Sequence, residues 1–236
     1  MNKKILILPA EYPTKDNPLA GIFTKDQVRM FASDGYDVTV IYNYFISLRK
    51  INFRNLKNFF IKTTLKKNKN ITEITNTLFS TFFHSMKLKL DYYLTKRLLV
   101  DYIKKKGKPD LIISHFAFPT GNSAFNIFKD FNIPYIIVEH STGYFTKLYN
   151  NYQIKIIKNS FKHSNSIVAV SSFLKKRLMN LTKKKIIIIG NIVDKKFFFL
   201  KKKVNNKKNF KKILKKERHN FYIYKKLKFN IIKRYI

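Results

Sequence analysis

The stretch that decides the fold is KKILILPAEYPTKDNPLAGIFTKDQVRMFASDGYDVTVIY, residues 3–42. Its wholly apolar run Ile5–Leu8 predicts a strand that is buried on both faces. A loop marked by Pro and Gly follows, and then an amphipathic helix that starts near Phe23 and closes near Gly35. A second run, Asp37–Tyr42, is rich in residues that favour strands. This order predicts a βαβ unit, which requires a parallel sheet.

The same alternation of short apolar strands and helices returns farther along the chain, after a segment without a clean period (43–70). A helix is expected at Asp91–Lys106. Strands are expected at Asp110–Ser114, Pro134–Val138, Ser166–Val170 and Lys185–Ile189, with helices between them at Asn122–Phe131, Asn151–Phe161 and Ser172–Asn180. The pattern predicts an α/β fold, a Rossmann-like doubly wound parallel sheet, over a domain of residues 1–199.

Residues 200–236 have a different character. Positions 201–236 hold 15 Lys and Arg residues and one acid, Glu217, with no Gly or Pro. We expect this basic C-terminal tail to be disordered or weakly helical, because it lacks the apolar periodicity that a second α/β domain would need.

The whole chain is strongly basic, with 49 Lys and Arg against 13 Asp and Glu and a formal net charge of +36. Such a charge attracts polyanions, which leaves an anionic membrane surface and nucleic acid as alternatives. A third interpretation is compositional drift, because abundant Lys, Asn, Ile, Phe and Tyr are typical of AT-rich coding sequence. The absence of cysteine excludes disulfides and thiolate metal sites.

Two observations bear on location. Met1–Pro9 is too short for the core of a signal peptide, and no apolar stretch approaches the ~18 residues of a membrane span. We therefore expect a cytoplasmic protein that at most makes peripheral contact with the inner face of an anionic membrane.

Small, polar or ionisable residues follow five of the expected strands. Because the carboxyl ends of parallel strands meet at one edge, where doubly wound folds bind ligands, these residues are expected to share one site. They are Gly21, His115, Glu139, His140, Ser171, Ser172, Asn191 and Asp194. Gly21 precedes a helix, where backbone N–H groups can approach a phosphate or a sugar hydroxyl; the alternative is an ordinary turn glycine. No dinucleotide-binding G-x-G-x-x-G or Walker motif is present.

His140 is the most informative titratable residue in this set. It can donate a hydrogen bond to a substrate hydroxyl or phosphate, or move a proton, and its alternative role is a loop histidine bonded to nearby backbone. His115 is a weaker candidate, and the two histidines lack a third ligand, so no metal site is expected. Glu139 is a candidate base or a candidate for orienting His140, and its alternative is a solvated loop acid. Ser171 and Ser172 most simply cap the helix that follows them.

Taken together, these stretches resemble the N-terminal domain of glycosyltransferase family 4, which comprises retaining enzymes of the GT-B fold. The resemblance rests on five segments in the family's order across residues 3–199. They are KILILPAEYPTKDNPLAGIFTKDQV, PDLIISHFAFPTG, IPYIIVEHSTGY, SIVAVSSFLKKRL and KIIIIGNIVDKKFF.

The resemblance implies an acceptor-holding domain that faces, across a cleft, a second domain holding the nucleotide-sugar. In that arrangement the loop ending at Gly21 approaches the donor phosphates and the acceptor, and His140 touches the transferred sugar as the catalytic residue. Ser171 and Ser172 would lie near the acceptor pocket, while His115 and Glu139 would complete the substrate-binding set. The nucleotide-sugar is a substrate, so no cofactor and no metal are expected.

The segment Asn191–Asp194 would lead into the interdomain linker, with Ile192 where the family usually has Gly. Nothing in 201–236 matches the basic pair and the glutamate pair of the family's C-terminal domain, whose charges would stabilise the leaving group. We therefore expect a truncated or frameshifted glycosyltransferase that is inactive alone, of a type acting on a polysaccharide or glycolipid acceptor. A non-catalytic acceptor-binding or remnant domain is one alternative. A charge-driven nucleic-acid binder is the other, although no nucleic-acid motif supports it.

Overall fold

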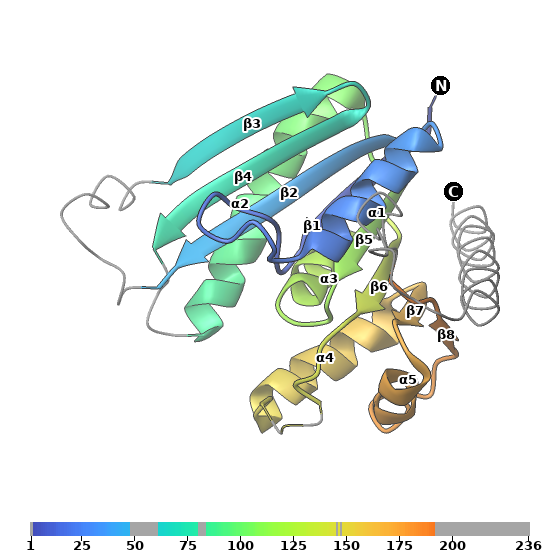
Figure 1. Ribbon diagram of the computed structural model, residues 1–236. Helices are drawn as coiled ribbons and strands as arrows, with labels where there is room; N and C mark the ends of the chain where they lie inside the picture. The colour runs from blue at the N-terminus through green and yellow to red at the C-terminus, as the bar shows by residue number, and fades with distance from the viewer. Residues whose placement is uncertain (1, 48–60, 80–83, 145, 147, 192–236) are drawn as a thin grey trace, which may run out of the picture.

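Eight strands form one sheet in the computed structural model, which describes residues 2–47, 61–79, 84–144, 146 and 148–191 (Figure 1). The strand order is β3-β4-β2-β1-β5-β6-β7-β8, and every neighbouring pair is parallel except β3 and β4. The strands are β1 Lys4–Pro9, β2 Asp37–Ile46, β3 Lys62–Asn68, β4 Ile71–Phe79, β5 Leu111–His115, β6 Tyr135–Glu139, β7 Ser166–Ala169 and β8 Ile186–Ile188. The helices are α1 Ile22–Ser33, α2 His84–Lys106, α3 Thr120–Phe131, α4 Asn151–His163 and α5 Ser172–Leu178.

The predicted doubly wound α/β sheet is confirmed, and the expected strands and helices are present with shifted ends. α2 begins at His84 rather than at Asp91, and β2 continues to Ile46 rather than ending at Tyr42. The hairpin of β3 and β4 was not expected, because β3 is exposed along its whole length and its sequence, KTTLKKN, shows no apolar alternation. The basic tail lies outside the described residues.

Helices cover both faces of the sheet. On one face, α2, α3, α4 and α5 pack on a core that includes Leu6 and Leu8 of β1, while on the other α1 packs on Ile5 and Ile7 (Figure 1). Consecutive residues of a strand point to opposite faces. The run Ile5–Leu8 is wholly apolar because each of its residues faces one core or the other.

Strand β1 lies between β2 and β5, so the chain winds outward from it in both directions. The carboxyl ends of β1 and β5 therefore form the switch point at which doubly wound sheets bind ligands. All strands except β3 end at this edge of the sheet, which is called the carboxyl edge below.

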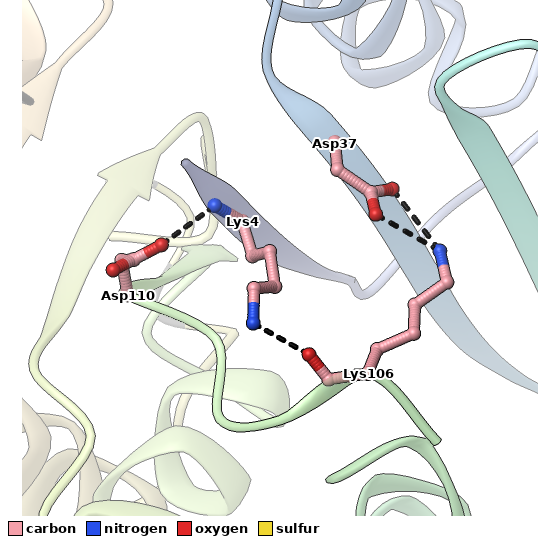
Figure 2. A network of polar contacts seen from close by, with 4 residues as sticks. All are labelled: Lys4, Asp37, Lys106 and Asp110. Atoms are coloured by element: carbon pink, nitrogen blue, oxygen red, sulfur yellow. Dashed lines mark hydrogen bonds and ion pairs between the residues drawn. The ribbon is translucent and has the colours of Figure 1, made fainter. Parts of the chain in front are cut away.

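The opposite edge, where the parallel strands begin, is closed by a polar network (Figure 2). The backbone N–H of Lys4 donates to Asp110 Oδ2 at 2.7 Å, and the Lys4 ammonium donates to the carbonyl of Lys106. The Lys106 ammonium in turn pairs with Asp37 Oδ2 at 3.0 Å. Since Lys106 ends α2, the network joins that helix end to β1, β2 and the start of β5. None of the described helices is both long and apolar enough to cross a membrane.

Candidate functional site

Helix α1 begins from a left-handed glycine at the carboxyl edge. Gly21 is its N-cap, with φ 59° and ψ 26°, and no side chain caps the helix. A Cβ at this position would lie 2.0 Å from the carbonyl oxygen of Glu11, so the loop and the helix start meet more closely than any other residue allows. The first turn of α1 is thereby held against the loop that leaves β1.

Two histidines meet at the centre of this edge. His115 is the last residue of β5 and is completely buried, and its Nδ1 lies 3.0 Å from Nε2 of His140, which follows β6. The register of the two strands sets this contact, because His115 is paired with Val138 and His140 lies two residues farther along. One ring donates and the other accepts, so the protonation of either ring constrains the other.

Aromatic side chains surround the half-buried His140. Phe23 of α1 stacks on it, with ring centroids 4.2 Å apart and planes at 27°, and Phe116 lies 5.4 Å away. Phe116 has a φ of 74°, an uncommon value for a bulky residue. Its N–H donates to the carbonyl of Val138, and its carbonyl accepts from Ser114 Oγ at 3.1 Å. These bonds hold a strained backbone in place beside His140, as is common at functional sites.

Glu139 organises the two loops that carry this cluster. The residue ends β6 and is completely buried. One carboxylate oxygen accepts from the N–H groups of His140 and Ser141, each at 2.9 Å, and the other accepts from Ala117 N–H and the Tyr144 hydroxyl, each at 2.8 Å. Burial raises the pKa of the Glu139 carboxyl, and these hydrogen bonds oppose the rise. The interpretation of Glu139 as a solvated loop acid is therefore wrong.

The loop after His140 is held by a second layer of contacts. Ser141 Oγ lies 2.7 Å from the Tyr149 hydroxyl and accepts from Gly143 N–H at 3.0 Å. The rings of Tyr144 and Tyr149 lie 5.0 Å apart. The His140 loop is thus fixed from both sides, by Glu139 and by these tyrosines.

The remaining predicted residues lie at the same edge or just beyond it. Ser171 caps α5, since its side chain accepts from Leu174 N–H at 3.1 Å, and Ser172 is the exposed first residue of that helix. Asn191 is exposed and follows β8, whereas Asp194 lies outside the described residues. The expectation that the strand ends bring Gly21, His140 and Ser172 to one edge is confirmed.

Sequence reasoning missed the aromatic residues of the site. Phe23 lies two positions after Gly21, and Tyr144 lies on the loop that follows Glu139, but an aromatic residue at either position has no distinctive spacing. Within the described residues, no group of three or more His, Cys, Asp or Glu side chains is placed to hold a metal ion.

Comparison with known proteins agrees with this arrangement. The family model described as Glycosyltransferase Family 4 matches residues 20–197, which include Gly21, α1 and both histidines of the carboxyl edge. The chain belongs to glycosyltransferase family 4. Its described part is a Rossmann-like half of the GT-B fold.

The relatives of this family 4 domain are longer proteins, and each is matched over about half of its length. The putative teichuronic acid biosynthesis glycosyltransferase TuaC of Bacillus subtilis (strain 168) is 26% identical over 187 residues, which cover 76% of this chain and 47% of TuaC. Sucrose-phosphate synthase from Thermosynechococcus elongatus has a similar fold, with a TM-score of 0.61, 14% identity, and coverage of 84% of this chain and 50% of the synthase. A putative UDP-N-acetylglucosamine 2-epimerase from Listeria monocytogenes gives a TM-score of 0.50 at 13% identity, covering 81% and 46%. The chain thus spans about half the length of these proteins.

Proposed function

We propose that this chain supplies the acceptor-side half of a glycosyltransferase that moves a sugar from a nucleotide-sugar to a polysaccharide or glycolipid acceptor. The observation that carries the proposal is His140, which lies at the carboxyl edge in contact with His115 of β5 and Phe23 of α1. A ring held from two elements by packing has the fixed orientation that transfer chemistry requires. The name of TuaC, which concerns teichuronic acid biosynthesis, supports a biosynthetic glycan acceptor.

The arrangement assigns a role to each part of the edge. His140 contacts the transferred sugar, and its contact with His115 couples the protonation of the two rings. The start of α1 behind Gly21 faces the donor phosphates, because a helix N-terminus attracts negative charge. Ser172 and Asn191, both exposed at this edge, contribute hydrogen bonds to the substrates.

Transfer also requires charge stabilisation of the leaving nucleoside diphosphate, usually a dominant contribution to catalysis. The described residues form one sheet with its helices, and in this proposal they supply the acceptor side of the cleft. We therefore expect the chain alone to bind a nucleotide-sugar weakly without turnover, a donor-binding lobe being required for transfer. No metal or cofactor is needed in this proposal.

The proposed place of action is the cytoplasmic face of an anionic membrane, where a lipid-linked acceptor would be found. The net charge of +36 supports this location, because basic proteins are attracted to anionic bilayers.

The proposal is tested by ligand-observed NMR with UDP-glucose and UDP-N-acetylglucosamine, together with an assay for UDP release. We expect weak binding that His140→Ala abolishes, and no release of UDP. His163→Ala is the matched control, because this histidine lies on α4, away from the carboxyl edge, and should leave binding unchanged. Release of UDP by the purified chain would disprove the need for a second lobe. Glycan binding without any nucleotide-sugar binding would favour the non-catalytic alternative.

A further inference from the structure

One part of the chain carries basic residues without a single acid. Residues 148–191, which contain α4, β7, α5 and β8, hold nine Lys and Arg residues and no Asp or Glu. Residues 2–47, by contrast, hold five basic and five acidic residues. The positive charge of the described domain is therefore strongly concentrated around α4 and α5.

Four of these lysines line one groove. The groove has a volume of about 440 Å³ and runs between the end of α4 and the turn that precedes β8. Lys158 and Lys162 contribute from α4, and Lys183 and Lys184 contribute from the turn, with Leu181 and Thr182 completing the lining. The Lys184 ammonium donates to the carbonyl of Ser164, so this lysine also has a structural role, while the other three project as exposed charges.

Two apolar side chains are also exposed in the same part of the chain. Phe173 on α5 is 63% exposed, and Met179, which follows that helix, is 59% exposed. Lys175, Lys176 and Arg177 lie between them in the sequence. A bulky apolar side chain among lysines is typical of surfaces that lie on a bilayer, where the apolar group enters the headgroup region and the cations meet lipid phosphates. A surface that binds nucleic acid through phosphate contacts alone has no use for an exposed Met.

We infer that the surface formed by the lysine groove and by Phe173 and Met179, the α4–α5 surface, docks on the anionic headgroups of a phospholipid bilayer. The inference rests on the proposed function for its biological purpose. The groove lies at the end of α4, opposite the carboxyl edge, whereas Phe173 lies in the first turn of α5, near that edge. A domain docked along α4 and α5 therefore stays beside the bilayer that would hold a lipid-linked acceptor.

The molecule offers a matched control for charge. Strand β3 is the first strand of the sheet and β8 is the last, so the two ends of the sheet are as far apart as the fold allows. Lys62, Lys66 and Lys67 of β3 are exposed, as are Lys158, Lys162 and Lys183 of the α4–α5 surface. Replacing either trio by Gln removes the same charge from the full chain and leaves the basic tail intact.

The test is co-sedimentation of the full chain with vesicles made from equal parts of phosphatidylglycerol and phosphatidylcholine. Each lysine close to an anionic surface strengthens binding about fivefold. The variant K158Q/K162Q/K183Q is therefore expected to bind about 100-fold more weakly than the parent, and K62Q/K66Q/K67Q within about threefold of it. F173S/M179S should lose about 10-fold, because two apolar side chains no longer enter the bilayer. Vesicles of phosphatidylcholine alone should not retain the protein.

Equal losses in the two lysine variants would overturn the inference, because they would show attraction by diffuse charge. Unchanged vesicle binding of F173S/M179S would also overturn it. So would DNA-duplex binding that is stronger than vesicle binding and depends on the same lysines, because the surface would then bind nucleic acid and not a bilayer. The vesicle assay involves no sugar. Loss of nucleotide-sugar binding in the earlier experiment would therefore refute the proposed function while leaving the docking surface intact, and the reverse also holds.

Discussion

The two edges of the sheet handle charge in opposite ways. At the edge where the strands begin, Lys106 and Asp37 form an ion pair whose side chains stay 30% and 26% exposed (Figure 2). At the carboxyl edge, the Glu139 carboxylate is completely buried, and its hydrogen bonds come from three backbone N–H groups and the Tyr144 hydroxyl. Water screens the ion pair, so it contributes little to the stability of the fold. The buried carboxylate is stable only when all four of its hydrogen-bond donors are in place.

This difference suits a supporting role for the edge where the strands begin and a functional role for the carboxyl edge. A partly exposed ion pair tolerates small movements, so it can join α2 to β1 and β2 without fixing their atoms closely. A buried carboxylate that accepts from both loops allows one geometry of the His115–His140 contact. We therefore expect substitutions at the carboxyl edge to have large effects and substitutions at the opposite edge to have small ones.

The largest effect is expected for Glu139→Ala. The substitution leaves buried donors on Ala117, His140 and Ser141 without an acceptor, which should lower the free energy of unfolding by about 4 kcal/mol. Urea unfolding followed by circular dichroism measures this change. Glu139→Gln keeps one acceptor oxygen and should lose less than half as much. A loss below about 1 kcal/mol for the alanine variant would show that the carboxylate does not organise the loops.

The burial of Glu139 should also make the free energy of unfolding depend on pH. Burial raises the pKa of its carboxyl, so the native protein holds the proton more tightly than the unfolded chain, in which a glutamate titrates near about 4.3. The free energy of unfolding should therefore fall as pH rises from that unfolded value through the raised native one. Burial raises the pKa of Asp91 as well, so the parent carries both contributions. Unfolding free energy is measured against pH for the parent and for Glu139→Gln, and the difference between the two profiles isolates the contribution of Glu139. Identical profiles would show that Glu139 does not cause the pH dependence.

The next largest effect is expected for Gly21→Ala. The new Cβ would lie 2.0 Å from the Glu11 carbonyl oxygen, so the loop or the start of α1 must move, and we expect a loss of about 3 kcal/mol in unfolding free energy. Gly35→Ala is the matched control. Gly35 also has a positive φ, 91°, but no atom lies within 4 Å of its added Cβ, so only backbone strain of about 1 kcal/mol should remain. Equal losses would show that close approach at Gly21 is unimportant.

The comparison of edges also shows what the sequence could predict. The run Ile5–Leu8 predicted a central strand because burial on both faces leaves no room for polar residues. The gathering of His115 and His140 at one edge followed from parallel strands alone. Strand β3 could not be found in this way, because an exposed edge strand, KTTLKKN, has no buried face to create an apolar pattern.

The detailed geometry of the site depends on tertiary contacts that the spacing of residues in the sequence does not reveal. Glu139 accepts from Ala117, which is 22 residues away in the chain and belongs to another loop. A single acid after a strand gives no sign of such burial. The positive φ of Phe116 is likewise imposed by bonds to Ser114 and Val138. The identity of the site residues was thus partly predictable, and their mutual support was not.

The smallest effect is expected where the edges contrast most, in the ion pair of Lys106 and Asp37. Lys106→Ala and Asp37→Ala should each lower the free energy of unfolding by about 0.5 kcal/mol, because the pair is partly exposed and water competes for both charges. The carbonyl of Lys106 still accepts from Lys4 in the alanine variant, so the backbone part of the network survives. A double-mutant cycle isolates the coupling energy, which should decrease further when the measurement is repeated at high salt. A coupling above about 2 kcal/mol would place this edge on a level with the carboxyl edge, and the division between a tolerant supporting edge and a closely fixed functional edge would then be wrong.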